Sequence, residues 1–273
     1  MSSILTNNSA MVALATLNNV NRGLNETQNR VSSGLAIRSG KENAAYFAIS
    51  ETMSGDSGMF KAINEGMTST KNSVATARLG AETVSNLAES FVERVAFAQG
   101  NGINLADVQS ELDSLVAQIG SAISQSTFNG DDLVSAAASV SVVTGITRSG
   151  GSFATTTISF NSVDLAAIQT TLSGIDLTTS TDLEADLSTA EGALAASITA
   201  ATSLGVSEKT LEGQMQFLDA LTDTLDSGVS AMVDANMEEE AARLQAFQVQ
   251  QQLATQSLSI ANQSPQNILS LFR

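Results

Sequence analysis

A single proline, Pro265, occurs in the 273 residues of this chain, and residues 229–264 contain neither proline nor glycine. These two residue types break helices most readily, so the run permits a helix of roughly 54 Å at 1.5 Å per residue. Apolar residues recur in it along two adjoining lines. One partner helix covers one such line, so we expect either contacts from several sides or burial inside one domain. The first stripe comprises Leu244, Phe247, Ala254, Leu258 and Ala261, and the second stripe comprises Ala246, Val249, Leu253 and Ile260.

The other end of the chain has a matching amphipathic segment. Ala10, Leu14, Leu17, Leu24 and Val31 follow the alternating three- and four-residue steps of a coiled-coil seam. Polar Asn21 and Gln28 occupy the missing steps, and the pattern ends near Gly34. The sequence therefore predicts one long helix at each end of the chain.

Between the ends, helical spacing covers residues 44–99, 105–126 and 182–227, with Asn104 as a candidate cap of the second segment. Asn129-Gly130 indicates a turn. Alternating β-branched residues on both sides of Gly150-Gly151 predict a two-stranded hairpin over residues 139–163, followed by a loop at 173–181. The halves mirror each other. We expect a mainly α fold: an elongated rod of long antiparallel helices with a small β-hairpin insert.

Charge is distributed unevenly along the chain. Residues 1–41 contain four basic residues and one acidic residue, and residues 241–273 contain two basic residues and no acidic one. The remaining six basic and 27 acidic residues lie between residues 42 and 240. A desolvated carboxylate is costly, so this pattern favours ends that become buried around a solvated acidic middle.

Several chemistries are excluded or disfavoured. The chain has no Cys and no His, which excludes Ser-His and Cys-His pairs, thiolate metal sites and imidazole ligands. We expect no cofactor and no metal, and we interpret Glu238-Glu239-Glu240, Asp131-Asp132 and the group at residues 182–186 as solvated helix starts or turns. A pI of about 4.1 disfavours nucleic acid. The sequence contains no run of about 18 apolar residues, so it does not predict a membrane-spanning helix. The first residues lack the pattern of a cleaved secretory signal.

Four motifs resemble those of bacterial flagellins. Residues 30–50, RVSSGLAIRSGKENAAYFAIS, are similar to the flagellin signature R-L-S-S-G-x-R-I-x-S-A-x-D-D-A-A-G-x-A-I-S. Phe128-Asn129-Gly130 resembles the family's turn, residues 237–244 resemble its second half, and residues 261–271 resemble its ending. The matching signature positions are Arg30, Ser32, Ser33, Gly34, Ile37, Ala44, Ala45, Ala48, Ile49, Ser50, Asn129, Gly130, Ala261, Asn262 and Pro265.

The chain also departs from the family pattern. Gly40 replaces the usual Ala, Glu42-Asn43 the usual acidic pair, and Tyr46-Phe47 the usual Gly-Leu. These departures bear on a turn and a helix start. The insert, about residues 135–189, is short compared with the large outer domains of other flagellins, so we expect an inner tube domain and a shaft domain only.

The resemblance implies a function. Flagellins are structural subunits of the bacterial flagellar filament; they leave the cell unfolded and polymerise through their terminal helices into a coiled-coil-like inner tube for swimming motility. It implies arms at 1–41 and 238–273 around a shaft at 42–237, an extracellular location, and no catalysis. The implied partners are further copies, the flagellar export apparatus, a flagellin chaperone, and cap and hook-filament junction proteins. We assign polymerisation or packing to Leu14, Leu17, Leu24, Val31, Leu244, Phe247, Val249, Leu253, Leu258, Ile260 and Leu271.

Other functions remain open from the sequence. A hook-filament junction protein shares the terminal architecture, a soluble coiled-coil adaptor would use the same apolar helices, and a glycosidase-like enzyme would need only carboxylates. The resemblance also suggests an immune phenotype. Flagellins that the innate Toll-like receptor senses carry a stretch like QRVRELAVQ, and Phe91 occupies the place of its first Arg here. We therefore expect a weak receptor response.

Overall fold

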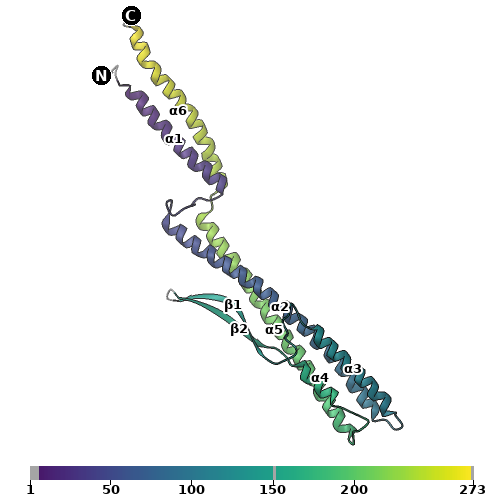
Figure 1. Cartoon of the computed structure of the whole chain (residues 1–273). Helices are drawn as coiled ribbons and strands as arrows, with labels where there is room; N and C mark the ends of the chain where they lie inside the picture. The colour runs from purple at the N-terminus through teal and green to yellow at the C-terminus, as the bar shows by residue number, and fades with distance from the viewer. Residues whose placement is uncertain (1–5, 150–151, 272–273) are drawn as a thin grey trace. The chain divides into compact units, whose positions relative to one another are not determined.

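The computed structural model describes residues 6–149 and 152–271, and in this range the predicted mainly α fold is confirmed (Figure 1). Two strands form an antiparallel hairpin, and the other elements are helices. In chain order the elements are α1 (Asn8–Ser33), α2 (Ala44–Ala98), α3 (Leu105–Gln125), β1 (Ser139–Ser149), β2 (Ser152–Asn161), α4 (Leu165–Ser173), α5 (Leu183–Val233) and α6 (Met237–Leu271).

Contacts divide the chain into two compact units. The first contains Met1–Asp56 and Thr224–Arg273, and the second contains Ser57–Asp223. Both expected arms, 1–41 and 238–273, fall in the first unit. Where arm gives way to shaft in an assembled subunit stays a prediction.

Side-chain caps explain where several helices begin and end. The amide oxygen of Asn7 accepts the N–H of Ala10 at the start of α1, and that of Asn104 accepts the N–H of Ala106 at the start of α3. Gly34 ends α1 in the left-handed conformation, with φ of 74°, which a residue without Cβ adopts at little cost. These boundaries agree with those predicted from Asn104 and Gly34.

The run without glycine or proline does not form one helix. α5 ends at Val233 and α6 begins at Met237, because the intervening backbone bonds to the other end of the chain. Ala235 donates its N–H to the carbonyl of Gly34 at 2.8 Å, and the carbonyl of Val233 accepts the N–H of Ala36 at 2.7 Å. Asn236 then caps α6 by accepting the N–H of Glu238. At the far end, Pro265 lies within α6 and does not end it.

In the second unit, α2 and α5 pair in antiparallel orientation. Lys71 on α2 forms an ion pair with Glu212 on α5 at 2.9 Å, and Arg78, two turns further along α2, reaches Glu208 at 2.7 Å. Partners move backward along α5 as they move forward along α2, which defines the antiparallel arrangement. α3 returns along α2, and Arg94 pairs there with Glu111 at 3.1 Å.

The insert combines the predicted hairpin with a helix that was not predicted. β1 and β2 pair through Val140 with Phe160 and Val142 with Ile158, and the turn at Gly150-Gly151 lies outside the described residues. The additional helix is α4. Its cap is Asp164, which accepts the N–H of Ala167 at 2.8 Å, and its buried residues are Leu165, Ile168 and Leu172.

Phe91 belongs to the hydrophobic core of the second unit and is fully buried. We expect Phe91→Ala to lower the free energy of unfolding by about 3–5 kcal/mol, because it leaves a cavity among α2, α3 and their neighbours. Phe97 on the same helix is 54% exposed. Phe97→Ala is therefore the matched control, and its cost should stay below about 1 kcal/mol in the same urea titration. Equal losses in the two variants would contradict this core assignment.

Candidate assembly interface

In the first unit, α1 and α6 lie side by side and antiparallel (Figure 1). Polar contacts join them along their length. The Asn7 amide donates to the carbonyl of Ala261 at 2.8 Å, and Gln251 donates to Asn21 at 2.7 Å. We call the end of the pair where α1 ends and α6 begins the closed end. Near it, Arg30 contacts Glu240 at 3.4 Å.

The first stripe of α6 faces α1. Ala254 is buried, and the other four residues of the stripe are half-buried. The ring of Phe247 lies directly over Gly23, where an added Cβ would come within 2.6 Å of it. Gly23 is therefore required for the close approach of the two helices. The buried residues of α1 are Ala13, Val20, Leu24 and Thr27.

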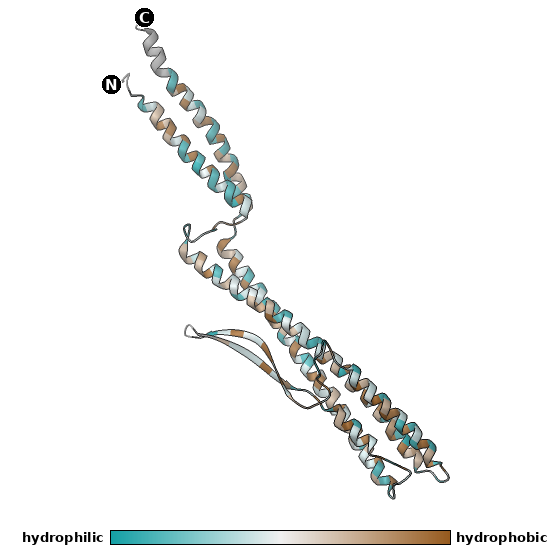
Figure 2. Ribbon diagram, viewed as in Figure 1, coloured by the Kyte–Doolittle hydropathy of each residue, from teal (hydrophilic) through white to brown (hydrophobic). Residues whose placement is uncertain are grey.

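The second stripe of α6 is exposed. Val249, Leu253 and Ile260 expose 55%, 60% and 64% of their surface, and Ala246 is also exposed. On α1, Met11 and Val12 are exposed to a similar degree. Hydrophobic residues recur along both helices (Figure 2), and those just named stay exposed when the two helices pair. A row of exposed apolar residues along a helix is typical of an interface with another chain.

The residues to which we assign packing fall into two groups. Within the α1–α6 pair, Leu24 is buried, and Leu17, Val31, Leu244, Phe247 and Leu258 are half-buried. Leu14, Val249, Leu253 and Ile260 are exposed. The Leu271 side chain lies outside the described part of the structure. The surface of α1 that meets α6 therefore does not include Leu14, and contacts of the exposed group with other subunits stay a prediction.

The signature residues of the first unit shape its closed end. Arg30 pairs with Glu240, Gly34 ends α1, and the N–H of Ile37 donates to Val233 at 3.3 Å. Ser33 bonds to the carbonyl of Asn29. Most other positions are exposed helix surface, and Ser50 is buried; this group comprises Ser32, Ala44, Ala45, Ala48, Ile49, Ser50 and Asn262. Ala261 accepts the amide of Asn7, and the Pro265 side chain lies outside the described part.

The departure at Glu42-Asn43 has a structural role. The Glu42 carboxylate accepts the backbone N–H of Arg38 at 2.8 Å and contacts its guanidinium at 3.1 Å. The backbone hydrogen bond and the nearby positive charge lower the pKa of Glu42. Asn43 accepts the N–H groups of Ala45 and Tyr46 and so caps α2. Asn43 thus supplies the cap at this helix start.

Glu240 differs from the two acids before it. Glu238 and Glu239 are exposed at the start of α6, as expected of a solvated helix start, but Glu240 is buried. Its Oε1 contacts Arg30 at 3.4 Å and Arg243 at 3.5 Å. Its Oε2 is buried and has no hydrogen-bond partner among the described residues. The interpretation of all three glutamates as solvated is therefore wrong for Glu240.

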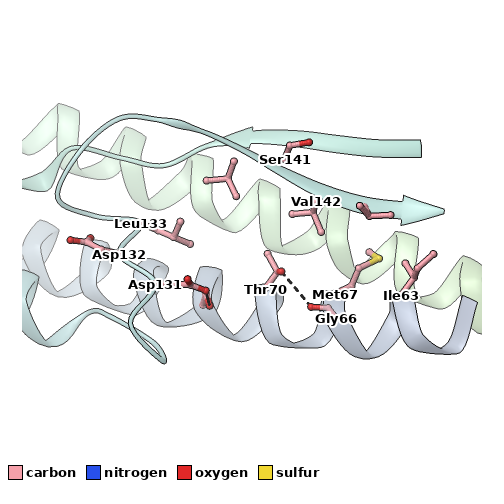
Figure 3. A pocket seen from close by; sticks show the side chains of 12 residues that line it. Ile63, Gly66, Met67, Thr70, Asp131, Asp132, Leu133, Ser141 and Val142 are labelled. Carbon is pink, nitrogen blue, oxygen red and sulfur yellow. Dashed lines mark hydrogen bonds between the residues drawn. The ribbon is translucent and has the colours of Figure 1, made fainter. Parts of the chain in front are cut away.

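A groove in the second unit lies between α2 and β1 (Figure 3). Apolar side chains such as Met67 and Val142 line it together with polar ones, which include Asp131 and Asp132. Asp131 accepts the Ser73 hydroxyl at 3.1 Å. A hydrogen bond from the Ser135 side chain, together with the N–H groups of Val134 and Ser135, lowers the pKa of Asp132. A glycosidase needs a general acid whose pKa is raised, and the pKa of Asp132 is instead lowered.

Asn129 and Gly130 form the predicted turn, both with positive φ, at 52° and 88°. Phe128 and Asp131 exchange backbone hydrogen bonds across it. Such a turn favours Asn-Gly because both central residues are left-handed. In the described ranges, no three acidic side chains converge on a possible metal position. No helix within residues 6–149 or 152–271 has the length and hydrophobicity needed to cross a membrane.

Comparison with known proteins gives matches at both ends of the chain. Residues 4–139 match the family described as bacterial flagellin N-terminal helical region, and residues 187–272 match the bacterial flagellin C-terminal helical region. A flagellin of Brucella melitensis biotype 1 is 36% identical over 281 residues, covering all of both chains. Flagellin FljK of Caulobacter vibrioides is 34% identical, covering 100% of this chain and 99% of its own. Flagellin C of Rhizobium meliloti is 31% identical and covers both chains fully.

Proposed function

The chain belongs to the bacterial flagellin family and is a structural subunit of the flagellar filament, and we propose that it polymerises through the outward surfaces of α1 and α6. The observation that carries the proposal is the exposed second stripe. Fully burying one Val, Leu or Ile side chain contributes about 1.5–3 kcal/mol. Burial of these three residues of each α6 against neighbouring subunits would therefore favour association.

Many apolar residues of the α1–α6 pair are incompletely buried within one chain. Leu17 and Leu258 are only half-buried, and the buried residues toward the free ends of the helices include the small Ala13 and Ala254. Isolated helices are marginal in water, and packing supplies most of their stability. We therefore infer that the arms are largely unfolded in the free subunit and fold as neighbours cover them, which couples folding to assembly.

An unfolded arm suits the route that the family implies. We propose that the subunit passes unfolded through the flagellar export apparatus, is held beforehand by a flagellin chaperone, and adds beneath the filament cap beyond the hook-filament junction proteins. A chain with one proline and no cysteine avoids slow isomerisation and disulfide reshuffling when it refolds. Head-to-tail addition gives an open extracellular helix in which each subunit presents two different surfaces. We expect no catalytic activity.

The alternatives fit the same helices less well. A hook-filament junction protein would share the terminal pair, but whole-length similarity to flagellins favours the filament subunit. A soluble adaptor would bind one partner helix. The two stripes of α6 instead give it one surface for α1 and another for neighbouring subunits.

The direct test of this proposal is seeded polymerisation. Purified subunit, mixed with short filament fragments or salt, should form long fibres with a helical lattice in electron micrographs. The matched control is a chain that lacks residues 238–273 and so has no second stripe. Fibres from the control, or discrete complexes from the full chain, would contradict assembly through the terminal helices.

The expected weak receptor response depends on the position that Phe91 occupies. Phe91 is fully buried, so its ring is not displayed where a receptor would meet the Arg of the QRVRELAVQ stretch. The surface there offers no guanidinium fork at this position, and we still expect a weak response. Reporter cells carrying the receptor should respond far less to this protein than to an enteric flagellin. A response of equal strength would contradict the prediction.

A further inference from the structure

Either of the two apolar stripes of α6 could in principle pack against α1. By composition the second stripe, with Ala, Val, Leu and Ile, is no less hydrophobic than the first. Burial of apolar area is not directional, so it does not decide between them. Yet the structure places the first stripe against α1 and leaves the second exposed. If α1 covered the second stripe, the surface proposed for assembly would be lost.

Two polar residues complete the spacing of the first stripe. Glu240 precedes Leu244 by four residues, and Gln251 lies between Phe247 and Ala254, so the line from Glu240 to Ala261 alternates steps of four and three. Each polar residue has a partner on α1: Arg30 for Glu240 and Asn21 for Gln251. A buried polar group that finds its partner in only one arrangement selects that arrangement, even where it adds little stability.

We propose that Glu240, assisted by Gln251, selects which face of α6 meets α1 and thereby keeps the second stripe free for neighbouring subunits. This inference rests on the proposed function for its consequence, but its geometry stands within one chain. Glu240 acts here as a positioning residue. Its position suits the task, because Arg30 lies in the last turn of α1 and Glu240 in the first turn of α6, where the helix dipoles favour these charges.

Glu239, the acid next to Glu240, is paired with Arg243 and not with Arg30. Glu239 lies on the exposed side of α6, and a pairing of Arg30 with Glu239 would rotate α6 toward its second stripe. Arg243 instead holds Glu239 at 2.7 Å, a closer contact than its 3.5 Å approach to Glu240. Which of the two neighbouring carboxylates pairs with Arg30 therefore determines which face of α6 meets α1.

Disulfide trapping tests the proposal in the free full-length subunit, because the chain has no cysteine of its own. Asn21→Cys with Gln251→Cys reports the observed face, and Asn21→Cys with Val249→Cys reports the second. The two cysteine pairs close loops of nearly equal length, so in an unfolded arm both pairs have the same effective concentration. In a glutathione buffer, the yield of the observed-face disulfide divided by that of the second-face disulfide would then be about one. Trapping of this kind also reports helices that pair only transiently.

We expect the observed-face disulfide to form in about tenfold higher yield than the second-face disulfide, or more. Glu240→Gln should bring this ratio of yields close to one. Glu239→Gln, the same change one residue away, should not lower the ratio. A double variant, Arg30→Met with Glu240→Met, should trap both pairs readily, because it keeps apolar packing while removing the selection. Seeded polymerisation of Glu240→Gln should be slowed relative to Glu239→Gln.

Three results would overturn the proposal. A ratio near one without any further change would show that the face is not chosen within one chain. An unchanged ratio in Glu240→Gln or in the double variant would show that Phe247 over Gly23 suffices. A loss of both pairs in Glu240→Gln, with neither gaining, would show a purely stabilising role. None of these bears on whether the unaltered chain polymerises, so failure of the filament function is detected separately.

Discussion

Replacing Leu253 with Asp should abolish polymerisation while leaving the subunit secreted and its shaft folded. Leu253 is 60% exposed on α6, so a carboxylate there is solvated in the single chain and costs little beyond about 0.5 kcal/mol of helix propensity. Between subunits the same charge would be desolvated without a partner, which costs several kcal/mol. Each 1.4 kcal/mol is a factor of ten, so the concentration needed for assembly should rise by about 100-fold or more.

The measurement has two parts. Immunoblots of culture supernatant should detect secreted subunit at normal amounts, and electron micrographs should show no filaments. Gln248→Asp is the matched control, since Gln248 is exposed on α6 but lies outside the second stripe. Normal filaments from Leu253→Asp would show that Leu253 is not buried between subunits. Loss of filaments in both variants would show that the apolar stripe is not the decisive surface.

Much of the fold follows from local sequence, because caps and turns depend on few residues. Asn104, Gly34 and Asn129-Gly130 mark boundaries through hydrogen bonds or through left-handed backbone, and the structure contains each of them. The start of α4 also has a local signal. Asp164 precedes apolar residues at Leu165, Ile168 and Leu172, which is a capped helical pattern between the predicted hairpin and the predicted loop at 173–181.

The candidate interface was harder to predict, because periodicity identifies an apolar face but not its partner. The break at residues 234–236 arises from hydrogen bonds to Gly34 and its neighbours, some 200 residues earlier, and local sequence does not contain them. Asn236 before three glutamates was the available local signal. The burial of Glu240 has no local signal either, because it depends on Arg30 of α1.

The second large effect concerns the arms as a whole, and limited trypsin digestion measures it. Arg22 and Arg30 lie within α1 and Arg243 lies within α6, so cleavage there requires these helices to open. Arg38 and Lys41 lie in the segment between α1 and α2 and are cleavable even if the pair stays folded. We therefore expect rapid cleavage at all five sites in the free subunit. The first three carry the information about the arms.

The shaft should resist under the same conditions. Its sites at Lys61, Lys71, Arg78, Arg94 and Lys209 lie on long packed helices, and several are tied to partners on neighbouring helices. Protease needs extended backbone, so exposure of a side chain on a stable helix does not suffice. Arg148 near the tip of the hairpin is the one shaft site where we expect slow nicking. Brief digestion should leave a core from about residue 39 or 42 to Arg243.

The isolated core should remain largely helical by circular dichroism, because α2, α3 and α5 keep their shared core. It should form no filaments with seeds that recruit the full chain, because both stripes of α6 have been removed. In assembled filaments, Arg22, Arg30 and Arg243 should become resistant as neighbouring subunits bury the arms. Equal rates at arm and shaft sites in the free subunit would mean that the α1–α6 pair is stable alone. A trimmed core that still polymerised would place the subunit contacts on the shaft instead.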